Sequence, residues 1–304
     1  ALSAIVVYFT GEAAADSLFL ETGAQSVLTT HADLALITVW YFGIFAAARI
    51  ALHWYQMFDK KLVQVLAFLI AAPGIFFLFQ TGDNGAKLVY GYGAGTGQLL
   101  ENEPMESFSV DSLDLESVPT SFVMKENGDW TWNMGENSVS ELLANFKWTT
   151  GTVNALSPAN VKVNDNYLLQ IAATSNPNFF VTNNNYINIQ VDIYLNMDSM
   201  NGDVKLVHHV MDEQNYDYVS LNSDGSIVQG RFVNGANTVF EESSTTETGM
   251  LFVRVVGSGT HFRGYVNQKM AVHGHGDVTT PGAVGLRIEG EGTLLIDKIE
   301  LTQL

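Results

Sequence analysis

Two long apolar runs near the start of the chain constrain its fold more than any other feature. Residues 34–52 form a run of nineteen with one charged side chain, and residues 62–79 form a run of eighteen with none. A helix of about 20 apolar residues spans the hydrocarbon core of a bilayer. Because only nine residues separate the runs, we predict an antiparallel pair of transmembrane helices at about residues 34–52 and 62–79, in contact with the lipid bilayer. The alternative, two helices buried in a soluble core, fits poorly with the polar loops in the rest of the chain.

Charges around the two runs predict their orientation. Arg49, Lys60 and Lys61 lie at or beside the connection, whereas acidic residues dominate the outer flanks. Cytoplasmic loops of membrane proteins are enriched in Lys and Arg, so we expect the connection in the cytoplasm. The prediction is therefore a bacterial inner (cytoplasmic) membrane protein, with everything after Phe79 in the periplasm or outside the cell.

Small residues on the first run predict a site of helix packing. Ala46 and Ala47 lie three and four positions after Gly43, so all three residues share one side of a helix. Such a face lets a neighbouring transmembrane helix approach closely.

The segment after the second run, TGDNGAKLVYGYGAGTG, resembles the signature that closes the last helix of a poorly characterised four-helix bacterial membrane family. The match runs over residues 86–95 and extends to His31, and the resemblance covers residues 1–97. It implies haem binding between histidines on different helices, which is a sound arrangement in a helical bundle. His31 and His53 are 22 residues apart on one helix, about 33 Å, so they cannot ligate the same iron. Haem b at His31 would need a histidine from outside this chain; otherwise both histidines are polar residues at helix ends.

Charge and cysteine content exclude several classes of function. The formal net charge is −18, and residues 101–304 contribute −16 of it, from 10 Lys/Arg and 26 Asp/Glu. An acidic surface without a basic cluster repels phosphates, so we exclude nucleic acid as a partner. The chain has no cysteine, which excludes disulfides, thiolate metal sites and cysteine nucleophiles. Residues 98–126 are predicted to form an extended acidic linker, because residues 101–116 hold six acidic and no basic side chains.

Residues 127–304 have the pattern of an all-β domain. Short runs rich in Val, Ile, Tyr and Phe alternate with clusters of Asn, Gly, Ser and Asp, as is typical of β-sandwiches. Alternation is clearest in residues 186–197, where one face is predicted to carry Ile187, Ile189, Val191 and Ile193. Nine or more such runs predict a two-sheet jelly-roll sandwich on the extracytoplasmic side of the membrane.

The order of these runs resembles the concanavalin-like jelly roll of laminin-G-type modules and of the 3-keto-disaccharide hydrolase family. The resemblance covers about residues 146–304 and is carried by segments such as DEQNYDYVSLNSDG, RGYVNQKM and PGAVGLRIEGEGTLLIDKIEL. It implies a fold more strongly than an activity. Related β-glucanases carry two glutamates in a Glu-Ile-Asp-x-x-Glu strand, which permits retaining hydrolysis, but the closest strand here, NIQVDIYLN, offers only Asp192. Because the sequence shows no nucleophile–base set or phosphate loop either, we predict that the protein is not an enzyme.

Aromatic residues are the candidates for carbohydrate binding, which requires an exposed platform beside amides and carboxylates. We select Tyr216, Trp130 and Trp132, and we expect Tyr216 to be the best exposed. Trp148 and Tyr218 lie in apparent strands and are predicted to belong to the core. The alternative for Trp130 and Trp132 is that both pack on one face, because they occupy alternate positions.

The segment HGHGD is the candidate metal site. His273, His275 and Asp277 occupy alternate positions, so in an extended chain their side chains would point the same way. This set could hold zinc or copper at the surface; the alternative is a Gly-rich hairpin with solvated histidines. His208 and His209 are expected on opposite faces of a strand, unable to chelate together. The jelly-roll resemblance also implies a structural calcium, whose ligands the sequence does not identify.

These features favour a non-catalytic accessory subunit, anchored by the helices in a larger respiratory or photosynthetic membrane complex. In this hypothesis the partners are other membrane-protein subunits, and the jelly roll supplies the protein contacts outside the cytoplasm. Two alternatives remain open. One is a surface glycan-binding protein, and the other is a haem-linked electron-transfer membrane protein.

Overall fold

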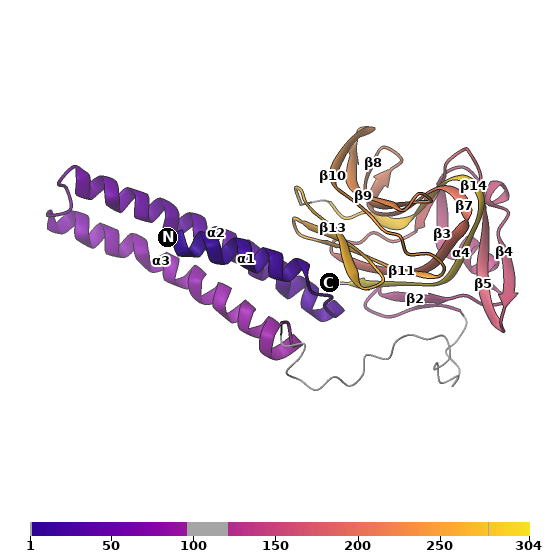
Figure 1. Ribbon diagram of the computed structural model, residues 1–304, viewed down its shortest axis with the longest axis horizontal. Helices are drawn as coiled ribbons and strands as arrows, with labels where there is room; N and C mark the ends of the chain where they lie inside the picture. Colours follow the sequence, from indigo (N-terminus) through magenta and orange to yellow (C-terminus); the bar gives the residue numbers. More distant parts are fainter. Residues whose placement is uncertain (1, 96–120, 279) are drawn as a thin grey trace. The chain divides into compact units, whose positions relative to one another are not determined.

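The computed structural model describes residues 2–95, 121–278 and 280–304 (Figure 1). The chain divides into two compact units, one helical and one built of β-strands. Most of the predicted linker, residues 98–120, lies outside the described residues. Its last part was predicted wrongly, because residues 122–124 form a strand of the β unit.

The helical unit contains α1 (Leu2–Asp16), α2 (Thr22–Trp54), α3 (Lys61–Ala86) and a π-helical turn, η1 (Lys87–Gly91), that continues α3. The antiparallel pair α2 and α3 forms a hairpin. Both α2 and the continuous segment Lys61–Gly91 are long and apolar enough to cross a membrane, and only 6% of the most apolar stretch of each is buried. The 33 residues of α2 extend about 50 Å, so the helix is longer than the predicted run.

Glycines of α3, rather than small residues of α2, bring the two helices together. A Cβ atom at Gly74 would lie 2.7 Å from the ring of Tyr41 and 2.9 Å from that of Phe42. The Tyr41 hydroxyl donates to the carbonyl of Ile70 beside this contact. By contrast, no atom lies within 4 Å of a Cβ built at Gly43. Gly43, the first residue of the predicted small-residue face, therefore makes no such close contact with α3.

The segment that carries the membrane-family resemblance closes the other end of the hairpin. Leu88 of η1 packs in a small buried cluster with Leu20, Ala24 and Leu28. The chain then turns back, because the amide of Ala94 donates to the carbonyl of Leu88 at 2.9 Å. The conspicuous LVYGYGAG sequence therefore forms a helix terminus that packs against the start of α2.

The β unit is a two-sheet sandwich. Its strands are β1 (Phe122–Met124), β2 (Trp130–Asn133), β3 (Phe146–Thr150), β4 (Ala159–Val163), β5 (Asn166–Ala173), β6 (Asn178–Thr182), β7 (Ile189–Asp212), β8 (Asn215–Asn222), β9 (Ser226–Val233), β10 (Ala236–Ser244), β11 (Leu251–Ser258), β12 (His261–Val266), β13 (Lys269–His275) and β14 (Ala283–Gln303). Two short helices, α4 (Ser138–Asn145) and α5 (Val153–Leu156), lie among them. One sheet has the order β1-β2-β14-β7-β11-β12-β13. In the other, β7 pairs with β8, β8 with β9 and β9 with β10, while β14 also pairs with β5 and β6.

The long strands β7 and β14 belong to both sheets, and they bend together where they pass between them. Gly202 and Gly290 are directly paired at this corner, with φ of 156° and 142°. A Cβ at Gly202 would lie 2.2 Å from the carbonyl oxygen of Glu289, and one at Gly290 would lie 2.3 Å from that of Asn201. Only glycine fits such a close approach of two backbones.

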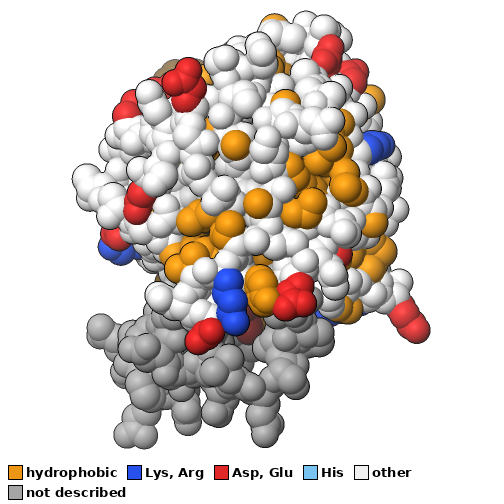
Figure 2. Space-filling model, turned by 90° about the vertical axis from the view of Figure 1, so that its right-hand side faces the viewer, with side chains coloured by type: hydrophobic (Ala, Val, Ile, Leu, Met, Phe, Trp, Pro, Cys, Tyr) orange, Lys and Arg blue, Asp and Glu red, His pale blue; other side chains and the backbone are white. Residues whose placement is uncertain are grey.

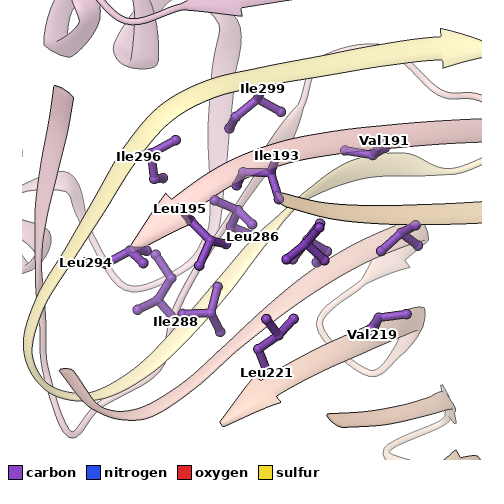
Figure 3. Packing of buried hydrophobic residues seen from close by; sticks show 14 of the residues in the cluster. Val191, Ile193, Leu195, Val219, Leu221, Leu286, Ile288, Leu294, Ile296 and Ile299 are labelled. Carbon is purple, nitrogen blue, oxygen red and sulfur yellow. The ribbon is translucent and has the colours of Figure 1, made fainter. Parts of the chain in front are cut away.

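The core lies between the sheets and is built from alternate residues of these strands. Figure 3 shows Ile193 and Leu195 of β7 packing with Leu286 and Ile288 of β14 and Leu221 of β8. Each of these side chains is at most 3% exposed. Full burial of an aliphatic side chain stabilises a fold by about 1.5–3 kcal/mol. The predicted all-β jelly-roll sandwich is confirmed by this architecture.

Candidate functional site

The three aromatic residues selected for carbohydrate binding are buried. Trp130 is 1% exposed, Trp132 is 0% exposed and Tyr216 is 4% exposed, so the expectation of an exposed platform was wrong. Alternation along β2 turns both indoles inward, where the ring of Phe146 lies 5.9 Å from Trp130 and 5.4 Å from Trp132. Tyr216 stacks on Phe232 with 4.9 Å between the ring centroids. Burial raises the pKa of Tyr216 to about 12.

A cleft of about 540 Å³ lies at one end of the sandwich. The turn between β8 and β9 forms one wall, residues 245–248 form another, and Asp198 of β7 lies beside them. The floor is apolar and consists of side chains that belong to the core, namely Met197, Met200, Leu221, Ile227 and Leu251. The walls carry hydroxyl, amide and carboxylate groups, from Asn222, Ser223, Asp224, Ser226, Thr245, Thr246, Glu247 and Thr248.

Hydrogen bonds fix the polar walls of this cleft. The Asp224 carboxylate accepts from the Ser226 amide at 2.9 Å and from its hydroxyl at 2.7 Å. These bonds hold the pKa of Asp224 below its usual value, so the group is ionised at neutral pH. The Thr245 amide donates to the carbonyl of Gly225 at 2.8 Å, which joins the two walls. The cleft thus presents fixed hydrogen-bonding groups around an apolar floor.

A second polar region is a buried network around Asp217. The carboxylate of Asp217 accepts a hydrogen bond from Nε of Arg231 at 2.5 Å and a second one from Nη2 of the same guanidinium at 3.2 Å. Nδ1 of His209 lies 3.1 Å from the same carboxylate and 2.8 Å from Nδ1 of His208. Phe262 lines the network, with its ring 5.9 Å from His208. Asp217, His208 and His209 are all buried, and Arg231 is half-buried.

The expectation that His208 and His209 point to opposite faces was therefore wrong. His209 has a left-handed φ of 50°, and the register between β7 and β8 shifts between His208 and Asp212. This irregularity breaks the alternation of the strand. The two rings consequently meet, with 4.7 Å between their centroids.

Burial sets the protonation of this network. It lowers the pKa of His208 to about 3, helped by the neighbouring His209. Burial alone would raise the pKa of Asp217, but hydrogen bonds from His209 and Arg231, together with the positive charge of Arg231, lower it. At neutral pH the network therefore contains a neutral His208 and an ionised Asp217 paired with Arg231.

A third region brings together three histidines at the edge of a sheet. His261 starts β12, and His273 and His275 lie near the end of β13. Each offers one ring nitrogen, and the three nitrogens all lie within 4.8 Å of one another. Asp277 was predicted to be the third ligand, but it lies beyond the end of β13 and is not part of this cluster. The sequence analysis missed His261.

His31, the candidate haem ligand, packs inside the helical hairpin. Its Nδ1 lies 2.9 Å from the carbonyl oxygen of Thr81. A Cβ at Gly85 would lie 3.0 Å from its ring. His53 lies near the far end of α2 and is exposed, in agreement with the predicted distance between the two histidines.

Asp192, the carboxylate on the strand compared with β-glucanases, is bound by Arg254 of the neighbouring strand. Each carboxylate oxygen of Asp192 accepts a hydrogen bond of 2.7 Å from the Arg254 guanidinium. This bidentate geometry is that of a strong ion pair, and it explains the position of Asp192 without catalysis.

Comparisons with known proteins find solved structures that are similar to the sandwich at low sequence identity. The carbohydrate-binding module CBM66 from Bacillus subtilis is 16% identical, with a TM-score of 0.42 over 51% of this chain and 94% of that one. A Bacillus subtilis protein of unknown function with a galectin-like fold is 9% identical, with a TM-score of 0.43 over 54% and 91%. A Bacillus licheniformis beta-glucanase is 8% identical, with a TM-score of 0.41 over 53% and 92%. These similarities are too distant to assign a function.

No protein-family model matches the chain. A search of curated proteins also finds no match. Function must therefore be inferred from the residues themselves.

Proposed function

We propose that this protein is a membrane-anchored carbohydrate-binding protein, with the cleft beside Asp198 and Asp224 as its sugar site. The observation that carries the proposal is the arrangement of fixed polar groups around an apolar floor in a cleft of about 540 Å³. Binding sites for small molecules commonly have volumes of about 300–1,000 Å³ and a few well-placed polar groups.

The chemistry of the cleft suits a sugar. Sugar hydroxyls both donate and accept hydrogen bonds, and the walls offer carboxylates, an amide and hydroxyls to match both roles. The Asp224 carboxylate is already oriented by Ser226, so binding a hydroxyl there costs little additional ordering. The methionine and leucine side chains of the floor suit the apolar C–H face of a sugar ring.

The helices support anchorage of this site at a membrane. The apolar side chains of α2 and α3 are largely exposed, and lipid would cover them at no cost to the fold. A nucleic-acid ligand is disfavoured by the acidic charge. Figure 2 agrees for one face of the sandwich, where the few Lys and Arg side chains stand apart from one another.

A glycan array probed with the full-length chain in nanodiscs tests the proposal. We expect a bound oligosaccharide whose affinity, measured by calorimetry, falls at least tenfold in Asn222→Ala and in Glu247→Gln. Glu242→Gln is the matched control, because it removes the same charge from an exposed position on β10 outside the cleft. An array without signal, or cleft variants that bind as well as the wild type, would refute the proposal.

The accessory-subunit hypothesis is a second candidate function, favoured by the small-residue face at Gly43. A Cβ atom built at Gly43 has no atom within 4 Å, and small residues are enriched where transmembrane helices meet. Extraction in mild detergent followed by mass spectrometry tests it. Stoichiometric co-migration with other membrane proteins, lost in Gly43→Leu, would support it, and a protein that migrates alone would refute it.

A further inference from the structure

We propose that His261, His273 and His275 form a binding site for a divalent transition-metal ion, with Zn²⁺ as its representative. Imidazole is a favoured ligand of Zn²⁺, Cu²⁺ and Ni²⁺, and sets of three histidines with one open position occur in zinc proteins. The site is separate from the cleft proposed to bind carbohydrate, with which it shares no residue.

The fold of one hairpin brings the three residues together. β12 and β13 are joined by a tight turn at Asn267 and Gln268, both with positive φ. The register shifts by one residue between Tyr265 and Gly264, so that Ala271 has no direct partner. This bulge places His261 directly opposite His275. Without it, His261 would face Gly274, and the cluster would not form.

Alternation along β13 adds the third ligand. His273 and His275 are two residues apart and share a face of the strand. Their ring centroids are 4.6 Å apart, and the ring of His261 lies 4.6 Å from that of His275. Three imidazoles from two strands therefore converge on one point at the edge of the sheet.

The distances fit coordination of a metal ion. Nδ1 of His261 lies 3.4 Å from Nε2 of His273. Two nitrogens bound tetrahedrally to zinc, each about 2.0–2.1 Å from the ion, lie about 3.3–3.4 Å apart. All three candidate nitrogens lie within 4.8 Å. His275 is the exposed member of the set.

Charged groups of both signs lie around the cluster, and they include Arg231, whose Nη1 lies 3.5 Å from a Cβ atom built at Gly276, next to His275. Glu241 of β10 accepts a hydrogen bond from the backbone amide of His273, which holds the strand in place and brings a carboxylate to the site. Arg263 lies opposite His273 in the register and contributes a positive charge to the same face. The chain as a whole carries a net charge of −18, which raises the local concentration of cations.

The geometry also leaves room for a ligand from solvent. His261 is 5% exposed, His273 is half-buried and His275 is exposed, so the cluster opens to the surface on one side. A water molecule or a side chain of a partner could occupy the fourth position.

Equilibrium dialysis of the full-length chain in detergent, purified without a histidine tag, tests the proposal with ZnCl₂ and with CoCl₂. We expect one ion per chain, a visible absorption band of tetrahedral Co²⁺, and an affinity for Zn²⁺ at least 100-fold lower in His273→Gln and His275→Gln. Asp277→Asn is the matched control, because Asp277 is exposed and lies two residues from His275; it should bind within about threefold of the wild type.

Three results would overturn the inference. The first is the absence of saturable Zn²⁺ binding, and the second is a histidine variant that binds Zn²⁺ as well as the wild type. The third is a loss of Zn²⁺ affinity in Asp277→Asn as large as that in the histidine variants. An unchanged unfolding midpoint of the metal-free His275→Gln variant would show that its loss of binding is not a loss of folding. CaCl₂ should neither bind with comparable affinity nor compete, because calcium prefers oxygen ligands.

Discussion

The two histidine clusters of the sandwich contain similar residues in very different surroundings. Around Asp217, His208 and His209 are buried, and Arg231 neutralises the carboxylate. At the sheet edge, His275 of the other cluster reaches solvent. The Nδ1 atoms of His208 and His209 are 2.8 Å apart, a hydrogen-bond distance shorter than the spacing of two nitrogens on one zinc ion.

Convergence of histidines is therefore not enough to define a metal site. The buried cluster supplies its own counterion and hydrogen bonds, so its groups serve the fold. The edge cluster has the spacing and the opening that a metal ion requires.

Removing the carboxylate from the buried network should cause the largest loss of stability. Asp217→Ala leaves Arg231 and His209 without their shared partner inside the sandwich. Breaking a buried ion pair on one side typically costs about 3–5 kcal/mol. Denaturant unfolding of the full-length chain measures this cost. A loss below about 1 kcal/mol would show that the network does not hold the fold.

Metal should stabilise the folded chain through the edge cluster. Zn²⁺ at 100 times its dissociation constant should raise the free energy of unfolding by about 2.7 kcal/mol, because it binds only the folded state. Thermal unfolding with and without ZnCl₂ provides the measurement. The stabilisation by Zn²⁺ should vanish in His275→Gln. If Zn²⁺ still stabilised this variant, the ion would bind elsewhere in the chain.

Acid should destabilise the sandwich through the buried cluster. The folded state keeps His208 neutral down to a pKa of about 3, whereas the unfolded chain protonates it near pH 6.5. Below pH 6.5 the unfolded state thus binds more protons, and stability falls as the pH falls. From pH 6.5 to pH 5 the loss from His208 is on the order of 2 kcal/mol. The free energy of unfolding, measured at several pH values across this range, should depend less steeply on pH in His208→Asn than in the wild type. An identical dependence would show that His208 is not the cause.

Changing the exposed histidine without metal should have the smallest effect. His275→Gln alters a side chain at the surface, and such substitutions usually change stability by at most about 0.5 kcal/mol. Chemical denaturation in the presence of a chelator checks this. A loss comparable to that of Asp217→Ala would mean that both clusters serve the fold.

The sequence was sufficient for the class of fold. Alternation placed Ile189, Val191 and Ile193 on the buried face of β7, where the structure finds them. Ile187 was placed there too, but it is 52% exposed because β7 begins only at Ile189. The two apolar runs likewise indicated the two long helices.

Local irregularities explain most of what the sequence analysis missed in the sites. The positive φ of His209 and the bulge at Ala271 each break simple alternation, and each decides which histidines meet. The turn residues Asn267 and Gln268 could have predicted the hairpin, and the hairpin would have placed His261 near His275. The burial of Tyr216 could not be predicted from the sequence, because it depends on packing against Phe179, which is distant in sequence.

X-ray absorption at the zinc edge of the Zn²⁺-loaded full-length chain tests the central contrast most directly. We predict that three imidazole nitrogens at about 2.0–2.1 Å dominate the first coordination shell of the ion. This shell should be lost in His275→Gln and retained in His208→Asn. A shell made mainly of oxygen, or a spectrum that changes with His208 but not with His275, would contradict it.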